Sequence, residues 1–139
     1  MPALDQDHHI VRHALEKDGW TITHDPLTLT VGQDRVHLDL GAERVIAAEK
    51  GIRKIAVEIK MFRGLSRVAD LEEAIGQYVV YRIALRRIDP TREIFLAIPQ
   101  AVLVNRFQQR ELYQGFITDE GGKLLGYDAE QEEIVQWLP

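Results

Sequence analysis

The spacing of apolar residues predicts one helix and several short strands in the first third of the chain. Residues 5–18 repeat apolar positions with a helical period, and Gly19 is suited to end that helix. The segments that follow are predicted to form a meander of three strands. These strands are residues 20–30, 35–40 and 44–50. Pro26 restricts the first strand to an edge or a bulge, and the last strand also fits a short helical piece.

Strict alternation predicts that residues 54–61 form a strand with two different faces. One face carries Ile55, Val57, Ile59 and Met61, and the other carries Ala56, Glu58 and Lys60. The second face therefore places a carboxylate and an ammonium group on a strand that otherwise has the composition of a core element.

A long helix is predicted over residues 67–88, with Ser66 as its N-cap and Asp89-Pro90 at its end. Its apolar face consists of Val68, Leu71, Ile75, Tyr78 and Val79. Residues 93–98 read as a continuous apolar strand. The order strand, helix, strand predicts one parallel crossover.

The remainder of the chain is predicted to contain a helix at 99–115 and a closing hairpin. The hairpin strands are 123–127 and 133–138, joined by residues 128–132. Together these elements predict an α/β fold in which a mixed central β-sheet is flanked by helices. The length of 139 residues is that of one domain spanning 1–139.

Composition narrows the chemistry. The chain has no cysteine, which excludes disulfides, thiolate zinc sites and cysteine nucleophiles. No apolar run approaches the roughly 18 residues of a membrane span and no signal peptide is evident, so we expect a cytoplasmic protein with no membrane contact. The net charge of -5 argues against strong non-specific nucleic-acid binding, but leaves room for a local basic patch.

The most informative polar residues are Glu58 and Lys60, which the strand period places about 6–7 Å apart on one face. Glu58 can bind a hard divalent cation, and Lys60 can position a water or stabilise charge on a phosphate oxygen. Asp39 ends an earlier predicted strand, and a meander can bring it beside Glu58. With the carbonyl of Ile59, these two carboxylates would form an oxygen-rich Mg²⁺ or Mn²⁺ site. Glu43 or Glu49 can supply the second acid instead of Asp39, because a one-residue slip in register reverses the faces.

The long helix offers further candidates. Gln77 and Tyr81 are four residues apart on it and can face the sheet near Glu58 and Lys60.

Basic residues follow the same strand. Arg63 and Arg67 flank the loop after Lys60 and can bind DNA phosphates. Arg82, Arg86 and Arg87 add positive charge at the end of the long helix, where they can bind phosphates near the cleft. For Arg86 and Arg87 we favour the other interpretation, in which basic residues of the last turn complement the helix dipole.

An acid, then E-x-K on a strand, then Q-x-x-x-Y on a helix resembles the pattern of the PD-(D/E)XK nuclease superfamily. The helix pair is similar to that of its RecB-type branch. Over essentially the whole chain, the closer resemblance is to the XisH family of fdxN element excision controlling factors. It rests on ALEKDGWTITHDPL (14–27), DLGAERVIAAEKG (39–51), IAVEIK (55–60), DLEEAIGQYVVYR (70–82) and EEIVQWLP (132–139).

The resemblance implies a restriction-endonuclease-like fold with Asp39 and Glu58 as metal ligands and Lys60 as the catalytic-type lysine. Gln77 would support them, with Tyr81 as a packing or substrate-side partner. Many enzymes of this fold also carry an acid on the first helix, and the resemblance makes His8 the candidate for that supporting position, with Glu16 as the other candidate. Family proteins are implicated in programmed excision of a DNA element in nitrogen-fixing cyanobacteria.

The resemblance also implies partners. These proteins are thought to assist a site-specific recombinase, with a small companion protein, XisI. We therefore expect a magnesium-dependent, nuclease-like DNA-processing protein. A homodimer would suit this activity, because cutting both strands of DNA needs two sites. The alternative is a regulatory protein that keeps the fold without catalysis and acts by binding the companion protein or the recombinase–DNA complex.

Overall fold

The computed structural model describes residues 6–46 and 51–139 of the chain. Five of the described elements are helical: α1 (His8–Lys17), α2 (Arg67–Ile88), α3 (Gln100–Val102), the π-helix η2 (Leu103–Phe107) and α4 (Glu111–Thr118). The strands are β1 (Thr21–His24), β2 (Leu27–Val31), β3 (Asp34–Leu38), β4 (Leu40–Ile46), β5 (Gly51–Ile59), β6 (Arg92–Pro99), β7 (Leu124–Asp128) and β8 (Glu133–Leu138). The expected mixed α/β fold class is confirmed.

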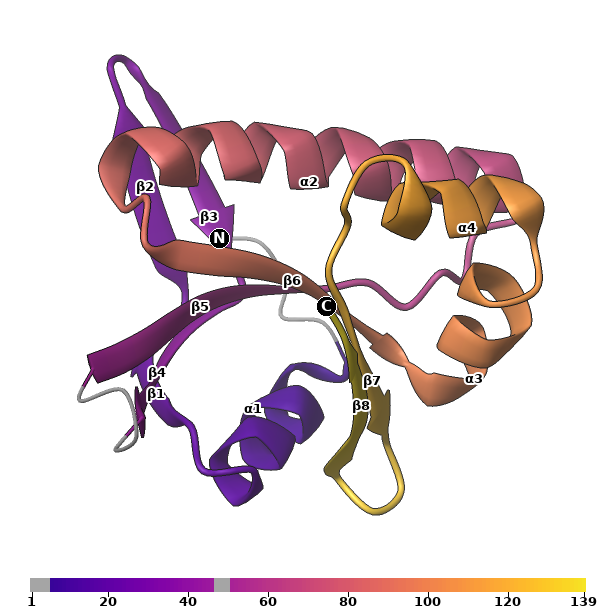
Figure 1. Cartoon of the computed structure of the whole chain (residues 1–139), viewed down its shortest axis with the longest axis horizontal. Coiled ribbons are helices and arrows are strands. Elements are labelled where there is room, and N and C mark those ends of the chain that lie inside the picture. The colour runs from indigo at the N-terminus through magenta and orange to yellow at the C-terminus, as the bar shows by residue number, and fades with distance from the viewer. Residues whose placement is uncertain (1–5, 47–50) are drawn as a thin grey trace.

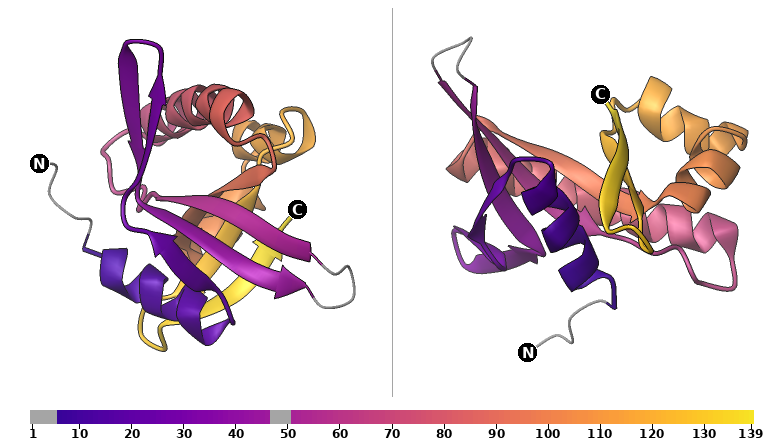
Figure 2. Two further views of the ribbon diagram at one scale, coloured as in Figure 1. Left: turned by 90° about the vertical axis from the view of Figure 1, so that its left-hand side faces the viewer. Right: turned by 90° about the horizontal axis from the view of Figure 1, so that it is seen from below.

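A six-stranded sheet forms the centre of the molecule, with strand order β1-β4-β5-β6-β7-β8 (Figure 1). The inner strands β5, β6 and β7 are parallel, whereas β1, β4 and β8 are antiparallel to their neighbours. The predicted parallel crossover is therefore the unit β5–α2–β6, and the predicted closing hairpin is β7–β8. Strands β2 and β3 pair only with each other and project from the sheet beside α2 (Figure 2).

The two faces of the sheet pack against different helices, as the alternation in β5 requires. Ile55, Val57 and Ile59 belong to the cluster that also contains Val11 and Leu15 of α1. Ala56 belongs to the other cluster, which holds the buried residues of α2, η2 and α4 together with the β2–β3 hairpin. Glu58, two positions after Ala56, therefore lies on the α2 face of the sheet.

Helix α2 has the bounds that the sequence predicts, because its start and end are encoded locally. The Ser66 hydroxyl accepts a hydrogen bond from the amide of Ala69 at 3.2 Å, which satisfies one of the free amides of the first turn. Leu71 and Tyr78 are buried as predicted. Val68 was expected on the same face, but it is 52% exposed.

The predicted three-strand meander is wrong in its pairing. The segment 20–30 is divided at the cis peptide bond Asp25-Pro26 into β1 and β2, and the segment 35–40 is divided at Asp39 into β3 and β4. Strands β2 and β3 leave the sheet as a hairpin, and β1 pairs with β4 instead. The predicted strand 44–50 starts earlier, at Leu40, and its residues 47–50 lie outside the described residues.

Two other boundaries also differ. The strand predicted at 54–61 spans Gly51–Ile59, so Lys60 and Met61 follow the strand instead of ending it. The single helix predicted at 99–115 is divided into α3, η2 and α4, with a break at 108–110. The wider turn of a π-helix shifts the side-chain period, which a uniform helical period in the sequence does not anticipate.

The glycines give a test of the packing. An alanine at Gly122 would place its Cβ 2.2 Å from the ring of buried Phe116, so we expect Gly122→Ala to lower the free energy of unfolding by about 1–3 kcal/mol. Gly76 lies in α2 with nothing within 4 Å of such a Cβ. Gly76→Ala should therefore raise the free energy of unfolding by about 0.5–1 kcal/mol. Urea unfolding measures both, and equal effects of the two changes would contradict this packing.

Candidate active site

Asp39 and Glu58 meet at the end of β5 through a reciprocal pair of hydrogen bonds. The backbone amide of Asp39 donates to Glu58 Oε1 at 3.2 Å, and the amide of Ile59 donates to Asp39 Oδ2 at 2.8 Å. This contact follows from the antiparallel register, in which Leu40 of β4 pairs with Val57 of β5. The structure thus brings together the two carboxylates that the sequence proposed as metal ligands.

The electrostatics of this pair are unfavourable for two negative charges. Glu58 is only 8% exposed. Burial, followed by repulsion from Asp39, raises the pKa of Glu58 from an ordinary 4.5 to about 8, although the charge of Lys60 acts in the opposite direction. A buried carboxyl with a raised pKa beside a second carboxylate is an arrangement that a cation would stabilise.

Helix α2 covers the carboxylate pair with one polar face. The Tyr81 hydroxyl donates to Glu58 Oε2 at 3.3 Å, and burial together with the Glu58 charge raises the pKa of Tyr81, so this hydroxyl remains a donor. Gln77 lies one turn earlier and is partly buried. Its Oε1 atom is buried and has no hydrogen-bond partner among the described residues. Of the two helix residues predicted here, Tyr81 makes the direct contact with Glu58.

Lys60 follows Glu58 on the same side of the chain, but its closest charged partner comes from α2. Its Nζ atom lies 3.5 Å from Glu73 Oε1, and the lysine side chain is 21% exposed. Glu73 was not anticipated, although it precedes Gln77 by one helical turn and so shares the face of Gln77 and Tyr81. That spacing is the signal that could have identified it.

The candidate donors suit a hard cation in number and type. In an extended strand, the N–H and C=O of one residue point to the same side, so the Ile59 carbonyl is directed to the side of Asp39. Two carboxylates and one carbonyl leave the remaining positions to water, as Mg²⁺ prefers. Within residues 6–46 and 51–139, no group of three or more His, Cys, Asp or Glu side chains is arranged so that it could hold a metal ion, so the set here is limited to two carboxylates.

The competing candidates lie elsewhere. Glu43 is four residues beyond Asp39, roughly 13 Å along the strand, and its carboxylate lies 3.7 Å from the Arg92 guanidinium. Glu49 lies outside the described residues. His8 is buried, and its Nε2 lies 2.6 Å from Asp25 Oδ1; no hydrogen bond in the described part of the chain connects His8 to Asp39 or Glu58.

Of the two predicted DNA-binding arginines, Arg63 lies beside the site, whereas Arg67 lines a separate pocket with Arg106 and Arg110. Arg63 and Arg67 are exposed. Nη1 of Arg63 donates to Gln6 at 2.8 Å, whereas no carboxylate of the described residues pairs with either guanidinium. Arg63 lines a pocket with Lys60 and Glu73. Positive charge therefore continues from Lys60 to the start of α2.

The fold and the site define a class: a mixed α/β protein in which a buried glutamate near the end of an inner parallel strand meets a half-buried aspartate immediately before the neighbouring strand, with a lysine two residues after the glutamate. The model of the XisH protein family matches residues 1–135. This chain belongs to the XisH family.

Two solved structures support this assignment. An XisH family protein from Nostoc punctiforme PCC 73102 is 43% identical with a TM-score of 0.84, and the match covers 97% of this chain and 100% of that one. An fdxN element excision controlling factor protein from Anabaena variabilis is 41% identical with a TM-score of 0.81, covering 95% and 97%. A search of curated proteins gave no match. Among the described residues, no helix is long and apolar enough to cross a membrane.

The raised pKa of Glu58 predicts a pH dependence of stability in the metal-free protein. Between pH 4.5 and about 8 the folded state holds a proton that the unfolded state has released, so stability falls as pH rises through this window. The variant Glu58→Gln has no ionisable group at this position, so it does not undergo this decrease in stability as pH rises. The stability of Glu58→Gln relative to wild type should therefore increase from pH 5 to pH 8.5 by at least about 1.4 kcal/mol, the equivalent of one pKa unit. Urea unfolding in a metal chelator measures the difference, and parallel pH profiles of the two proteins would contradict it.

Proposed function

We propose that the chain is a metal-dependent, nuclease-like DNA-processing protein of the PD-(D/E)XK type, with a restriction-endonuclease-like fold, that acts in the excision of a DNA element. The observation that carries the proposal is the convergence of Asp39 with buried Glu58, with Lys60 two residues further along. The name of the Anabaena variabilis relative, an fdxN element excision controlling factor, supports the process.

In this proposal Asp39, Glu58 and the carbonyl of Ile59 hold Mg²⁺ or Mn²⁺. The bound ion would supply Lewis-acid chemistry, lowering the pKa of a water and polarising a phosphate oxygen. Occupation of the site requires Glu58 to give up its proton. Tyr81 keeps the Glu58 carboxylate in a fixed orientation through its hydroxyl.

Lys60 has the position of the charge-stabilising residue. Its ammonium can donate to a phosphate oxygen as negative charge develops there, or orient the attacking water. The partner Glu73 has a 65% exposed side chain, so the ion pair is open to solvent and can be exchanged for a substrate phosphate. Gln77 has an unpartnered buried Oε1 and can accept a hydrogen bond from that water or substrate.

DNA would reach the site over the basic residues at the start of α2. Arg63 and Arg67 are exposed and without a carboxylate partner in the described residues, which suits contacts with the phosphate backbone. A site-specific recombinase and an XisI-like companion protein are the proposed protein partners, and a homodimer would supply a second site for the opposite strand.

The metal site is tested by thermal unfolding with Mn²⁺. At ten times the dissociation constant, Mn²⁺ should stabilise the wild-type protein by about 1.4 kcal/mol, and Glu58→Gln and Asp39→Asn should abolish this gain. Glu43→Gln is the matched control, because Glu43 lies on β4 away from the pair and should leave the gain intact. Below pH 8 the affinity for Mn²⁺ should increase by up to about tenfold per pH unit, since binding displaces the Glu58 proton. A gain that survives in Glu58→Gln would refute the site.

Catalysis is tested separately through Lys60. Lys60→Ala should keep the Mn²⁺ stabilisation but reduce nicking of plasmid DNA by about 100-fold or more, because it removes a group that acts on the transition state. The measurement is conversion of supercoiled to open-circular plasmid, with Glu43→Gln again as control. If wild type binds Mn²⁺ yet cleaves no form of DNA, the regulatory alternative replaces the nuclease. A complex with the companion protein that persists in Lys60→Ala would then be its direct evidence.

A further inference from the structure

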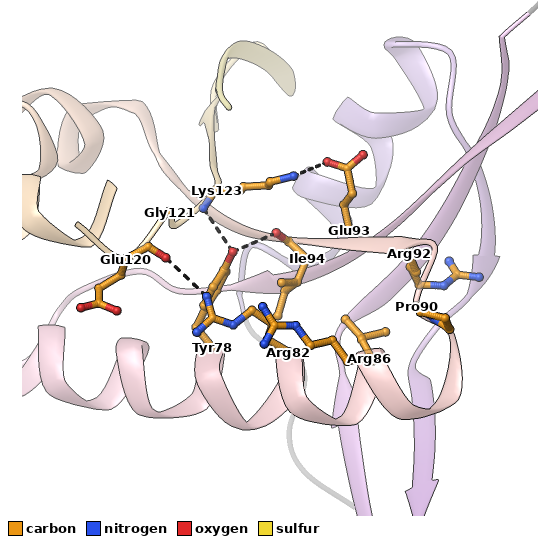
Figure 3. Close-up of a pocket in the computed structure, with 11 residues that line it drawn as sticks. Tyr78, Arg82, Arg86, Pro90, Arg92, Glu93, Ile94, Glu120, Gly121 and Lys123 are labelled. Atoms are coloured by element: carbon orange, nitrogen blue, oxygen red, sulfur yellow. Dashed lines mark hydrogen bonds and ion pairs between the residues drawn. The ribbon is translucent and has the colours of Figure 1, made fainter. Parts of the chain in front are cut away.

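A second polar cavity lies between the latter half of α2, the start of β6 and the loop that leads into β7 (Figure 3). Its volume is about 330 Å³, within the size range of small-molecule sites. Four basic and two acidic side chains line it: Arg82, Arg86, Arg92, Lys123, Glu93 and Glu120. None of the residues proposed for metal binding or catalysis lines this cavity, so the two sites are distinct.

Arg82 lines the cavity and carries an unused hydrogen-bond donor. Its Nε atom is buried and has no hydrogen-bond partner among the described residues, while its Nη1 donates to the carbonyl of Glu120 at 3.4 Å. The guanidinium also lies over the Tyr78 ring, 5.6 Å from the centroid, which fixes its plane. A buried charged donor without a partner costs stability, and the Nε edge is the part of a guanidinium that binds two oxygens of an oxyanion.

Arg86 adds a second free guanidinium. It lies one helical turn after Arg82, where like charges repel, and no carboxylate of the described chain pairs with it. Arg86 lies in the last turn of α2, as the helix-dipole interpretation requires, and its side chain also extends along α2 toward Arg82 (Figure 3). Burial raises the pKa of Tyr78, and the charges of both arginines oppose this rise, so both act near that hydroxyl.

The acidic residues of the cavity do not neutralise these two arginines. Glu93 accepts an ion-pair hydrogen bond from Lys123 and lies 3.3 Å from Arg53. The Glu120 carboxylate is directed away from Arg82 (Figure 3). Positive charge therefore remains in excess at one place on a chain whose net charge is -5.

We propose that this cavity binds a phosphate group between Arg82 and Arg86. Phosphate offers the planar pairs of oxygens that guanidinium edges recognise, and it relieves both the unpaired Nε and the repulsion between the two arginines. The phosphate belongs to a nucleic-acid backbone or to a free phosphate compound, and the two sources are distinguished below.

The first experiment is titration of the metal-free protein with inorganic phosphate in the millimolar range, at ionic strength held constant with chloride. Wild type should bind, and Arg86→Ala should weaken binding roughly tenfold or more, which is the expected effect of losing one charge-assisted contact. Arg87→Ala is the matched control: it removes the same charge one residue later, outside the cavity, and should change binding less than twofold. Arg82→Met tests the buried donor. If Arg82→Met fails to fold, Arg86→Ala still tests the site, because Arg86 is exposed and its replacement should not disturb folding.

Two further arms identify the source of the phosphate. A short single-stranded oligonucleotide whose binding is weakened by Arg86→Ala and displaced by inorganic phosphate points to a nucleic-acid backbone. Binding of a nucleoside monophosphate with the same dependence, but of no oligonucleotide, points to a free phosphate compound. No phosphate binding by wild type, or equal losses in Arg86→Ala and Arg87→Ala, would overturn the proposal while leaving the metal site untouched.

Discussion

The interlocked hydrogen bonds between Asp39 and Glu58 are the constraint on which the rest of the site depends. The Glu58 carboxylate accepts a hydrogen bond from the amide of Asp39, and the Asp39 carboxylate accepts one from the amide of Ile59. These bonds connect the end of the β2–β3 hairpin to strand β5. The tie fixes two acids side by side on the buried face under α2. Burial and the nearby Asp39 disfavour the charged form of Glu58, so its pKa is raised to about 8 in the metal-free protein. In the proposed metal site, folding stability and cation binding would therefore make opposite demands on the charge of Glu58.

Helix α2 organises the polar chemistry because different edges of it face different parts of the sheet. One edge places Glu73 against Lys60 and Tyr81 against Glu58 at the end of β5. Another places Tyr78 and Arg82 over the start of β6 and the loop before β7. A helix that serves two polar sites cannot have a single apolar stripe, and its core contacts rely on residues such as Leu71 and Leu85.

The distribution of positive charge reconciles the acidic net charge of the chain with the anionic ligands that we propose. Most basic side chains near the sheet are paired, as Lys54 is with Asp89 and Lys123 with Glu93. Within the described residues, guanidinium groups without a carboxylate partner occur at both ends of α2, with Arg67 at its start and Arg86 near its end. A local excess of positive charge, not the net charge of the chain, decides where a phosphate can bind. Salt screening limits the effect of more distant charges to about 10 Å.

The sequence by itself determined the elements whose signals are local. The Ser66 cap and Asp89-Pro90 bounded α2, and the alternation around Glu58 assigned its side chain to the correct face of β5. The closing hairpin and the parallel crossover also followed from local patterns. These predictions succeeded because capping, turn and periodicity rules act over a few residues.

Only the tertiary structure decided which acid joins Glu58. The sequence favoured Asp39 but left Glu43 and Glu49 open, and the pairing of β4 with β5 places Asp39 beside Glu58; that register is a contact between distant segments. The departure of β2 and β3 from the sheet, the Lys60–Glu73 pair and the cavity at Arg82 have the same origin. Each of these features depends on which distant segments pack together. The same packing buries Glu58 and so sets its charge state, and no local pattern in the sequence encodes that burial.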